Sequence, residues 1–457
     1  MSRLVCAGCG AEPRAAEPYP FRCPNAGGDD DVDHVLRREL DLSTARLPLN
    51  DAEPNPFVRY RKLFHAYGLG LPDEEFRAIV RRLDREVAAI DGHGFAVTPF
   101  ARSAGLSDSL GFSERGGVWV KDETGNVSGS HKARHLFGVV LWLEIAERLG
   151  LADAHRRPEL AIASCGNAAL AAAVVAAGAG RALRVFVPED ADPVVLSRLE
   201  ELGALVTVCP RTDAVGDPTV LQLRKALADG ALPFTCQGSL NGLAIEGGLT
   251  LGYELASARP TLDRMVVQVG GGALASACIQ SMREAVALGA LPSAPKIDTV
   301  QTRGAWPLKR AFDRVVERGG TPAAVRYAAR HRSEFMWPWE REPHSVARGI
   351  LDDETYDWLA VVEGMLATRG TPLVVDEETL EQANTLARAA TGVDVDHTGS
   401  AGLAGLLALR EADRVADDER VAVLFTGVVR GAPPERRTYD EELSRARHPV
   451  AQRLRAG

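Results

Sequence analysis

Short apolar runs alternate with longer helical stretches along most of this chain. From about Leu71 onward, runs rich in valine, isoleucine and leucine occupy residues 118–121, 160–163, 183–188, 204–208, 265–269, 297–300 and 421–425. Helical stretches rich in alanine or leucine separate these runs, and the first of them ends near Gly150. Nearly continuous apolar strands separated by helices are typical of a parallel sheet covered on both faces. The pattern therefore predicts an α/β fold with more than one sheet.

The first forty or so residues do not follow this pattern. Cys6 and Cys9 lie in one short segment and Cys23 lies in a second, as in the two knuckles of a small zinc ribbon. The second knuckle lacks its second cysteine, and an acidic run followed by Asp33 and His34 stands in its place. Two alternatives remain open. Either Cys6, Cys9, Cys23 and His34 (or Asp33) bind zinc, or the segment is a degenerate ribbon without metal.

Composition narrows the class of protein. The chain has 457 residues, of which 46% are hydrophobic and 25% are charged, as in ordinary globular proteins. Its formal net charge of -9 argues against nucleic acid or an anionic membrane as a partner, because both bind basic surfaces. No apolar run is long enough to cross a bilayer. Seven cysteines without a disulfide spacing, and no signal peptide, predict reduced thiols and a cytoplasmic location.

Four segments with small residues follow apparent strands, at the sheet edge where open parallel sheets bind ligands. In the first, residues 121–134, a turn of small residues leads to Lys132 in the opening turn of a helix. A lysine close to helix N-terminal amides and partly removed from water can have a lowered pKa and form a Schiff base. Taken alone, a solvated lysine is the simpler interpretation.

The second segment, residues 163–169, is another strand, turn and helix. Ser164 and Asn167, with the free amides of the turn, could hold a carboxylate or a ring oxygen. Alternatively, Asn167 is only a helix N-cap and Cys165 only a small buried residue.

The third and fourth segments contain Gly270–Gly272 and Thr426. Three successive glycines allow backbone amides to surround a phosphate, although their spacing is not that of the dinucleotide fingerprint. A nucleotide-binding protein that uses this loop is one alternative, and a tight turn without function is another. Thr426 could offer its hydroxyl to a ring nitrogen or be an ordinary turn threonine.

Together the four segments resemble the motifs of fold-type II pyridoxal-phosphate (PLP) enzymes. That family includes threonine synthase, serine/threonine dehydratase, cysteine synthase and the tryptophan synthase beta chain. The motifs read KDETGNVSGSHKAR, ASCGNAALA, VGGGALAS and LFTG, in that order. The resemblance covers nearly everything from Leu63 to Gly427, and the cysteine-bearing start resembles the ribbon that precedes some threonine synthases.

The resemblance implies two domains with open, mostly parallel sheets and the cofactor between them, in a homodimer. We expect a zinc-ribbon-like segment at 1–40, a large cofactor-binding domain at 41–133 and 237–430, a smaller mobile domain at 134–236, and a C-terminal tail at 431–457.

Carried over by position, the resemblance also implies roles for single residues. Lys132 would carry the cofactor and act as acid and base. The ring hydroxyl would contact Asn167, and the pyridine nitrogen would face the neutral hydroxyl of Thr426, which favours chemistry at the β-carbon over transamination. Residues expected at the cofactor are Lys132, His131, Asn167, Gly270, Gly271, Gly272, Ala273 and Thr426; those expected at the substrate carboxylate are Ser164, Cys165, Gly166 and Asn167.

The motifs depart from each known subfamily. His131 resembles the tryptophan synthase beta chain, yet residues 160–169 lack the carboxylate of that enzyme, so indole chemistry is not expected. After Gly427 the chain continues Val-Val-Arg, without the further polar groups typical of threonine synthases. We expect β-elimination or β-replacement on a small amino acid, such as serine, threonine or an activated derivative, through an aminoacrylate-type intermediate. The alternatives are a threonine synthase acting on phosphohomoserine and a PLP-binding protein without turnover.

Overall fold

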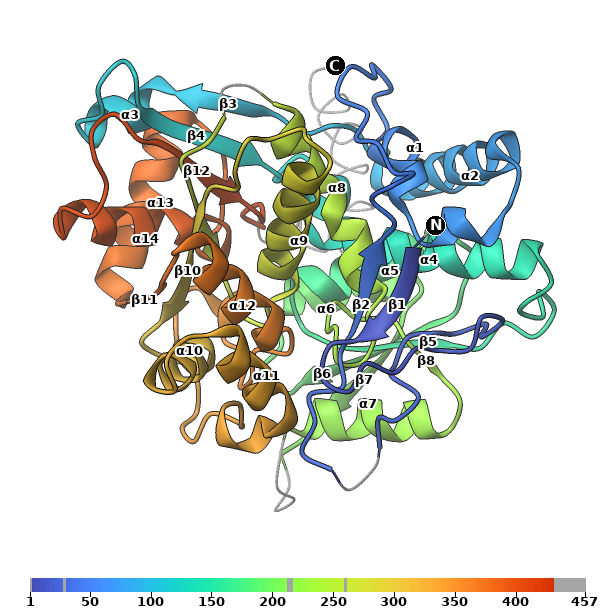
Figure 1. Cartoon of the computed structure of the whole chain (residues 1–457). Helices are drawn as coiled ribbons and strands as arrows, with labels where there is room; N and C mark the ends of the chain where they lie inside the picture. The colour runs from blue at the N-terminus through green and yellow to red at the C-terminus, as the bar shows by residue number, and fades with distance from the viewer. Residues whose placement is uncertain (1, 28–29, 212–216, 259–260, 431–457) are drawn as a thin grey trace, which may run out of the picture.

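Two mostly parallel sheets form the frame of the molecule (Figure 1). The computed structural model describes residues 2–27, 30–211, 217–258 and 261–430. In the larger sheet the strands lie in the order β11 (Pro372–Val375), β10 (Lys296–Thr302), β9 (Arg264–Gln268), β12 (Arg420–Phe425), β4 (Gly117–Asp122) and β3 (Phe100–Ser103), and only the β3–β4 pair is antiparallel. The smaller sheet is parallel, in the order β7 (Leu205–Cys209), β6 (Leu183–Pro188), β5 (Leu160–Ala163) and β8 (Leu232–Pro233). The expected α/β fold is confirmed.

Helices cover both faces of the larger sheet (Figure 1). On one face lie α13 (Glu377–Thr391) and α14 (His397–Glu411), and α14 packs on β9, β10 and β12. On the other lie α8 (Ala244–Ser257), α9 (Ala273–Ala287) and α12 (Trp358–Thr368), with α10 (Pro307–Glu317) and α11 (Pro322–Arg330) beside them. Because both faces are covered, the central strands are buried and can be apolar throughout.

The smaller sheet carries α5 (Asn167–Gly178), α6 (Pro193–Glu201) and α7 (Pro218–Ala228). Helix α4 (Lys132–Arg148) connects the two halves, because it packs on both α5 and α8. Helix α2 (Asp73–Asp91) lies against α5 at Gly178, where an added Cβ would come within 2.8 Å of Val87. The remaining helical elements of the described residues are α1 (Pro56–Arg59), α3 (Ala104–Ser109) and the 3₁₀ turns Arg61–Leu63, Ala66–Leu69, Val127–Gly129, Arg332–Glu334 and Arg348–Ile350.

Every strand expected from an apolar run is present, and no end is shifted by more than two residues. The apolar pattern missed β3, β8 and β11, because β3 is a polar edge strand, β8 has 2 residues, and β11 begins with a proline. The strands of the larger sheet all fall within residues 41–133 and 237–430, and those of the smaller sheet within 134–236. The domain limits themselves stay a prediction, and the expected tail at 431–457 lies outside the described residues.

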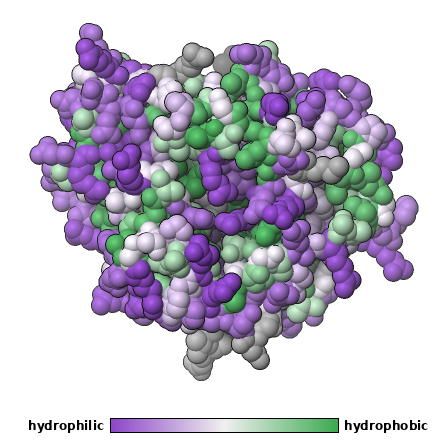
Figure 2. Space-filling view, in the orientation of Figure 1, coloured by the Kyte–Doolittle hydropathy of each residue, from purple (hydrophilic) through white to green (hydrophobic). Residues whose placement is uncertain are grey.

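The N-terminal segment forms a small antiparallel sheet of β1 (Ser2–Cys6) and β2 (Leu36–Leu40). It lies beside α8 and α9, and apolar side chains gather near the upper centre of this face (Figure 2). A cavity of about 300 Å³ lies between β2, α8, α9 and α12, with Leu36, Leu249, Ile279 and Leu359 in its wall and none of the motif residues. No helix within the described residues is both long and apolar enough to span a membrane.

Candidate active site

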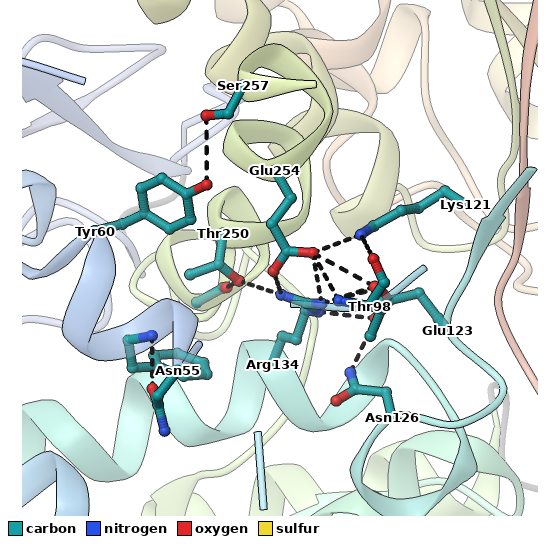
Figure 3. Close-up of polar contacts among 12 residues, drawn as sticks. Asn55, Tyr60, Thr98, Lys121, Glu123, Asn126, Arg134, Thr250, Glu254 and Ser257 are labelled. Atoms are coloured by element: carbon teal, nitrogen blue, oxygen red, sulfur yellow. Dashed lines mark hydrogen bonds and ion pairs between the residues drawn. The ribbon is translucent and has the colours of Figure 1, made fainter. Parts of the chain in front are cut away.

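Lys132 opens α4 directly after the loop that follows β4. A buried ion network fixes this first turn (Figure 3). The Arg134 guanidinium donates from Nε to Glu123 Oε2 at 2.8 Å and from Nη1 to Glu254 Oε1 at 2.6 Å, while Lys121 pairs with the other Glu254 oxygen. All four side chains have at most 2% of their surface exposed. Two cations and two carboxylates balance, so the network can be buried without a net charge.

The loop before Lys132 has an unusual backbone. Ser128 has φ +58, a left-handed conformation that non-glycine residues seldom adopt. Its amide donates to Asp91 Oδ2 at 2.9 Å and its carbonyl accepts from Arg430 Nη2 at 2.9 Å. Ser130 forms a bridge to Gly427 at the end of β12. The first and fourth motifs are therefore in direct contact.

His131 is held as a neutral ring beside the fourth motif. Its Nδ1 lies 3.2 Å from the Thr426 carbonyl oxygen and donates to it. Burial lowers the pKa of His131 well below its usual value, and the charge of Lys132 acts in the same direction. The buried Nε2 has no partner among the described residues. A neutral imidazole with an unused nitrogen is thus available inside the site.

The glycine loop connects β9 to α9 and presents unused amides. Among the described residues, none of the amides from Gly270 to Leu274 donates to a backbone carbonyl, and the Gly271 amide faces the Asp352 carboxylate. Gly272 has φ +97, which L side chains rarely adopt. Free amides at the start of a 15-residue helix form an anion cradle, which fits a phosphate group.

A segment that the sequence analysis did not single out packs against this cradle. Thr355 Oγ1 donates to the Gly270 carbonyl at 3.0 Å, and the Asp357 amide donates to the Gly271 carbonyl at 3.0 Å. A Cβ added to Gly270 would collide with the carboxylate of Asp352. Burial raises the pKa of Asp352 to about 6, against the opposing influences of Lys132 and the Gly271 amide. A carboxylate therefore lies at the rim of the loop assigned to phosphate.

Thr426 lies at the end of β12 with 2% of its surface exposed. Its Oγ1 accepts from Gln268 Nε2 at 2.7 Å. Because that bond uses the hydroxyl as an acceptor, its own proton remains free to be donated. The arrangement fits a ring nitrogen that accepts a hydrogen bond.

Asn167 is the first residue of α5, and the N-cap position belongs to Gly166, which has no side-chain cap. The N-cap interpretation of Asn167 is therefore wrong. Its Oδ1 accepts from Arg430 Nη2 at 2.7 Å, and its Nδ2 lies 3.5 Å from Asp396 Oδ2. In the preceding turn, Ser164 Oγ accepts from the Gly166 amide at 3.5 Å, and Cys165 is exposed.

The four motifs thus lie at the carboxyl ends of β4, β5, β9 and β12. Contacts join the first, second and fourth, and the charge of Lys132 reaches Asp352 and Asp357 beside the third. The unused amides, the Thr426 hydroxyl and the lysine fit pyridoxal phosphate. Asp352, Asp396, Gln268 and Arg430 had no assigned role. In the sequence, Asp352 is marked only by the acidic run that it begins. Arg430 is marked only by the Val-Val-Arg sequence after Gly427, which differs from that of threonine synthases.

The N-terminal cysteines converge as the metal-binding alternative requires. Ligand atoms of Cys6, Cys9, Cys23 and His34 all lie within 4.8 Å of one another. Asp33 does not join them, because it is buried and pairs with Arg332 at 3.3 Å. Three thiols and one imidazole form a donor set that suits tetrahedral zinc.

The second nitrogen of the His34 ring also has a partner. His34 Nε2 lies 3.1 Å from Asp30 Oδ1, a contact that fixes which ring nitrogen faces the thiols.

The chain is similar to known proteins over most of its length. The family model described as pyridoxal-phosphate dependent enzyme matches residues 92–427. Threonine synthase of Methanosarcina acetivorans is 27% identical over 433 residues, which cover 93% of this chain and 91% of that protein. Threonine synthase of Methanocaldococcus jannaschii is 27% identical over 337 residues, covering 72% and 74%.

Solved structures show the same fold. The processed form of threonine deaminase isoform 2 from Solanum lycopersicum superimposes with a TM-score of 0.57 at 16% identity, covering 83% of this chain and 94% of that one. Maize serine racemase superimposes with a TM-score of 0.56 at 18% identity, covering 81% of this chain and 98% of that one. The family match, the threonine synthase relatives and the four motifs at one sheet edge agree: this chain belongs to the pyridoxal-phosphate dependent enzymes of fold type II, whose cofactor is pyridoxal 5′-phosphate.

Proposed function

We propose that this enzyme catalyses β-elimination or β-replacement on a small amino acid, serine, threonine or an activated derivative. The observation that carries the proposal is the Thr426 hydroxyl at the end of β12, bonded to Gln268. A neutral hydroxyl at the pyridine nitrogen leaves that nitrogen unprotonated, so the ring withdraws electrons only moderately. That favours loss of a group from the β-carbon over transamination. The named activities of the relatives and structural neighbours support the same class of chemistry.

Each group of the site has a task in this proposal. When bound, PLP supplies a carbonyl that takes up the substrate's amino group and a ring that accepts electrons. The amides of the glycine loop would hold its phosphate. The Lys132 amine would take the α-proton from the substrate and return it to the leaving group or product. The turn from Ser164 to Asn167 receives the substrate carboxylate and orients the α-proton toward the lysine.

Threonine synthesis from phosphohomoserine is the second candidate. The Methanosarcina acetivorans relative, which matches across 93% of this chain, favours it. Against it stands the Val-Val-Arg sequence after Gly427, which lacks the further polar groups typical of threonine synthases. A PLP-binding protein without turnover is a further alternative, which the presence of Lys132 argues against. A nucleotide-binding protein would leave the lysine and asparagine motifs without a role.

Absorption spectra test the proposal. The purified protein with added PLP should show the visible band of a lysine-bound cofactor. Lys132→Ala should lose it, and Lys309→Ala on the surface of α10 should keep it. Serine or threonine should then shift the band and release a keto acid and ammonia. Phosphohomoserine giving threonine and phosphate would establish the second candidate, and a shifted band without product would establish binding without turnover. If no band forms with excess PLP, the proposal is wrong.

Two further expectations belong to this proposal. A homodimer is expected from the family resemblance, and sedimentation of the holoenzyme tests it. A cytoplasmic location is supported by the seven cysteines, none of which forms a disulfide. Localisation of the tagged protein in its own cells tests that expectation.

A further inference from the structure

The side-chain amide of Asn167 is held between groups of opposite charge. Arg430 Nη2 donates to its Oδ1 at 2.7 Å, and its Nδ2 lies 3.5 Å from Asp396 Oδ2. A guanidinium can only donate and a carboxylate accepts, so the two partners dictate which end of the amide faces which way. The amide lies close to the backbone of Gly427, where an added Cβ would come within 2.6 Å of Nδ2.

The same guanidinium reaches the loop that precedes Lys132. Arg430 Nη2 also donates to the Ser128 carbonyl at 2.9 Å, in the residue with φ +58. Ser128 precedes α4 and Arg430 follows β12, which is part of the larger sheet. Asn167 begins α5, which packs on β5 and β6 of the smaller sheet. One side chain therefore ties both halves of the molecule together at the site.

Asp396 is itself anchored. It caps α14, where its Oδ1 accepts from the Gly399 amide. The path from Arg430 through Asn167 to Asp396 thus ends on a rigid helix that packs on the larger sheet. A network anchored in this way can hold an amide in one orientation.

We propose that Arg430 is a positioning residue: it fixes the amide of Asn167 with its nitrogen available to the cofactor and holds α5 against the loop before Lys132. The inference rests on the proposed function only in placing Asn167 at the cofactor's ring oxygen. Without Arg430, the Asn167 oxygen loses a charge-assisted donor and the amide can flip. A flipped amide would present an oxygen to another oxygen, which repels the ligand instead of binding it.

The first test compares Arg430→Gln, Arg430→Lys and Arg420→Gln with the unchanged protein. Arg420 is the matched control. It begins β12, the strand that precedes Arg430, and it pairs with Asp263 at 2.8 Å. Neither Arg420 nor Asp263 is a motif residue or contacts one within the described part of the chain. Arg430→Gln should bind PLP about tenfold more weakly, the value of one charged hydrogen bond. It should also change the pH dependence of the bound cofactor's visible absorption. Arg430→Lys should recover part of both, and Arg420→Gln should match the unchanged protein.

A double-mutant cycle asks whether Arg430 acts through Asn167. Once Asn167→Ala has removed the amide, adding Arg430→Gln should weaken PLP binding no further. If the two losses multiply, Arg430 does not act through Asn167, and its role in positioning that amide is wrong. It is equally wrong if Arg430→Gln alone binds PLP as tightly as the unchanged protein.

Hydrogen exchange on the cofactor-free protein separates this inference from the proposed function. Arg430→Gln should raise amide exchange in the first turn of α5 and in residues 126–131, while Arg420→Gln should not. If the unchanged protein fails to bind PLP, the proposed function fails but the exchange result still decides whether Arg430 ties these segments. Unchanged exchange in Arg430→Gln would overturn the inference.

Discussion

Arg134 and Glu254 form a buried ion pair, with 2.6 Å between Nη1 and Oε1. Arg134 lies two residues after Lys132, the lysine assigned to the cofactor. The pair joins α4 to α8, and the contacts to Glu123 and Lys121 extend it to the end of β4 (Figure 3). Lys132 is consequently placed by residues that have no assigned role at the cofactor or substrate. Its position depends on a charge balance in the interior.

Glu254→Gln should destabilise the protein strongly. The change leaves Lys121 and Arg134 with one carboxylate between them in the interior, which costs about 3–5 kcal/mol. Urea unfolding of the cofactor-free protein measures it. Asp394→Asn is the control, because Asp394 is 73% exposed and pairs with Arg388 at the surface, so its loss should change stability by at most about 0.5 kcal/mol.

A second change should recover part of that loss. Lys121→Met added to Glu254→Gln restores the balance of one cation to one carboxylate in the network. If the double variant is no more stable than Glu254→Gln, charge balance does not explain the network.

Asp352→Asn should tighten binding of PLP and of inorganic phosphate. The carboxylate lies at the rim of the glycine loop, and its pKa is raised to about 6 by burial, so it is mostly ionised at pH 8 and mostly neutral at pH 5. The gain should reach about tenfold at pH 8 and shrink at pH 5, as expected for removal of one nearby like charge. Titration at both pH values measures it, with Asp353→Asn as the neighbouring control.

If Asp352→Asn binds PLP and phosphate no more tightly than the unchanged protein at pH 8, the carboxylate does not repel the phosphate. The carboxylate would then support the loop instead of competing with the phosphate.

Stability should fall as pH rises from 5 to 8, in part through Asp357. Burial raises the pKa of this carboxyl from 3.8 to about 7, although the Gly238 amide favours the charged form. Between pH 3.8 and about pH 7 the Asp357 carboxyl is protonated in the folded protein and ionised in the unfolded chain. The stability that this proton contributes is therefore fully present below pH 3.8 and lost above about pH 7.

Asp357→Asn should remove roughly 2–3 kcal/mol of the pH 5 to pH 8 difference. Urea unfolding at the two pH values, in the absence of cofactor, tests this. An unchanged difference in Asp357→Asn would assign the pH dependence to other groups.

The N-terminal cluster should bind one zinc ion. His34→Ala and Cys9→Ser should each lose the metal, because a tetrahedral site needs all four ligands. Asp30→Asn should weaken binding by about tenfold through loss of the contact to the His34 ring. Metal content after dialysis measures these effects, with Cys209→Ser as the control. A protein purified without metal that also takes up none would be a degenerate ribbon.

Much of the candidate site could be read from local sequence. Lys132, the three glycines and Thr426 each follow a strand, and strand ends of a parallel sheet meet at one edge, so order along the chain already places them together. The contacts that orient these groups could not be read in the same way. Arg430 contacts Asn167 and Ser128, which lie 263 and 302 positions earlier in the sequence. Asp396 contacts Asn167 across a separation of 229 positions.

The sequence by itself determined the α/β fold, the strands that are apolar runs and the motifs that carry the chemistry, because apolar runs and glycine turns are local signals. Tertiary structure decided that His34 rather than Asp33 faces the cysteines, that Asp352 lies against the glycine loop, and that Arg430 holds Asn167. These outcomes depend on which way a side chain turns and on what the rest of the chain places opposite it. Hydrogen bonding and burial select among such orientations only after the chain has folded.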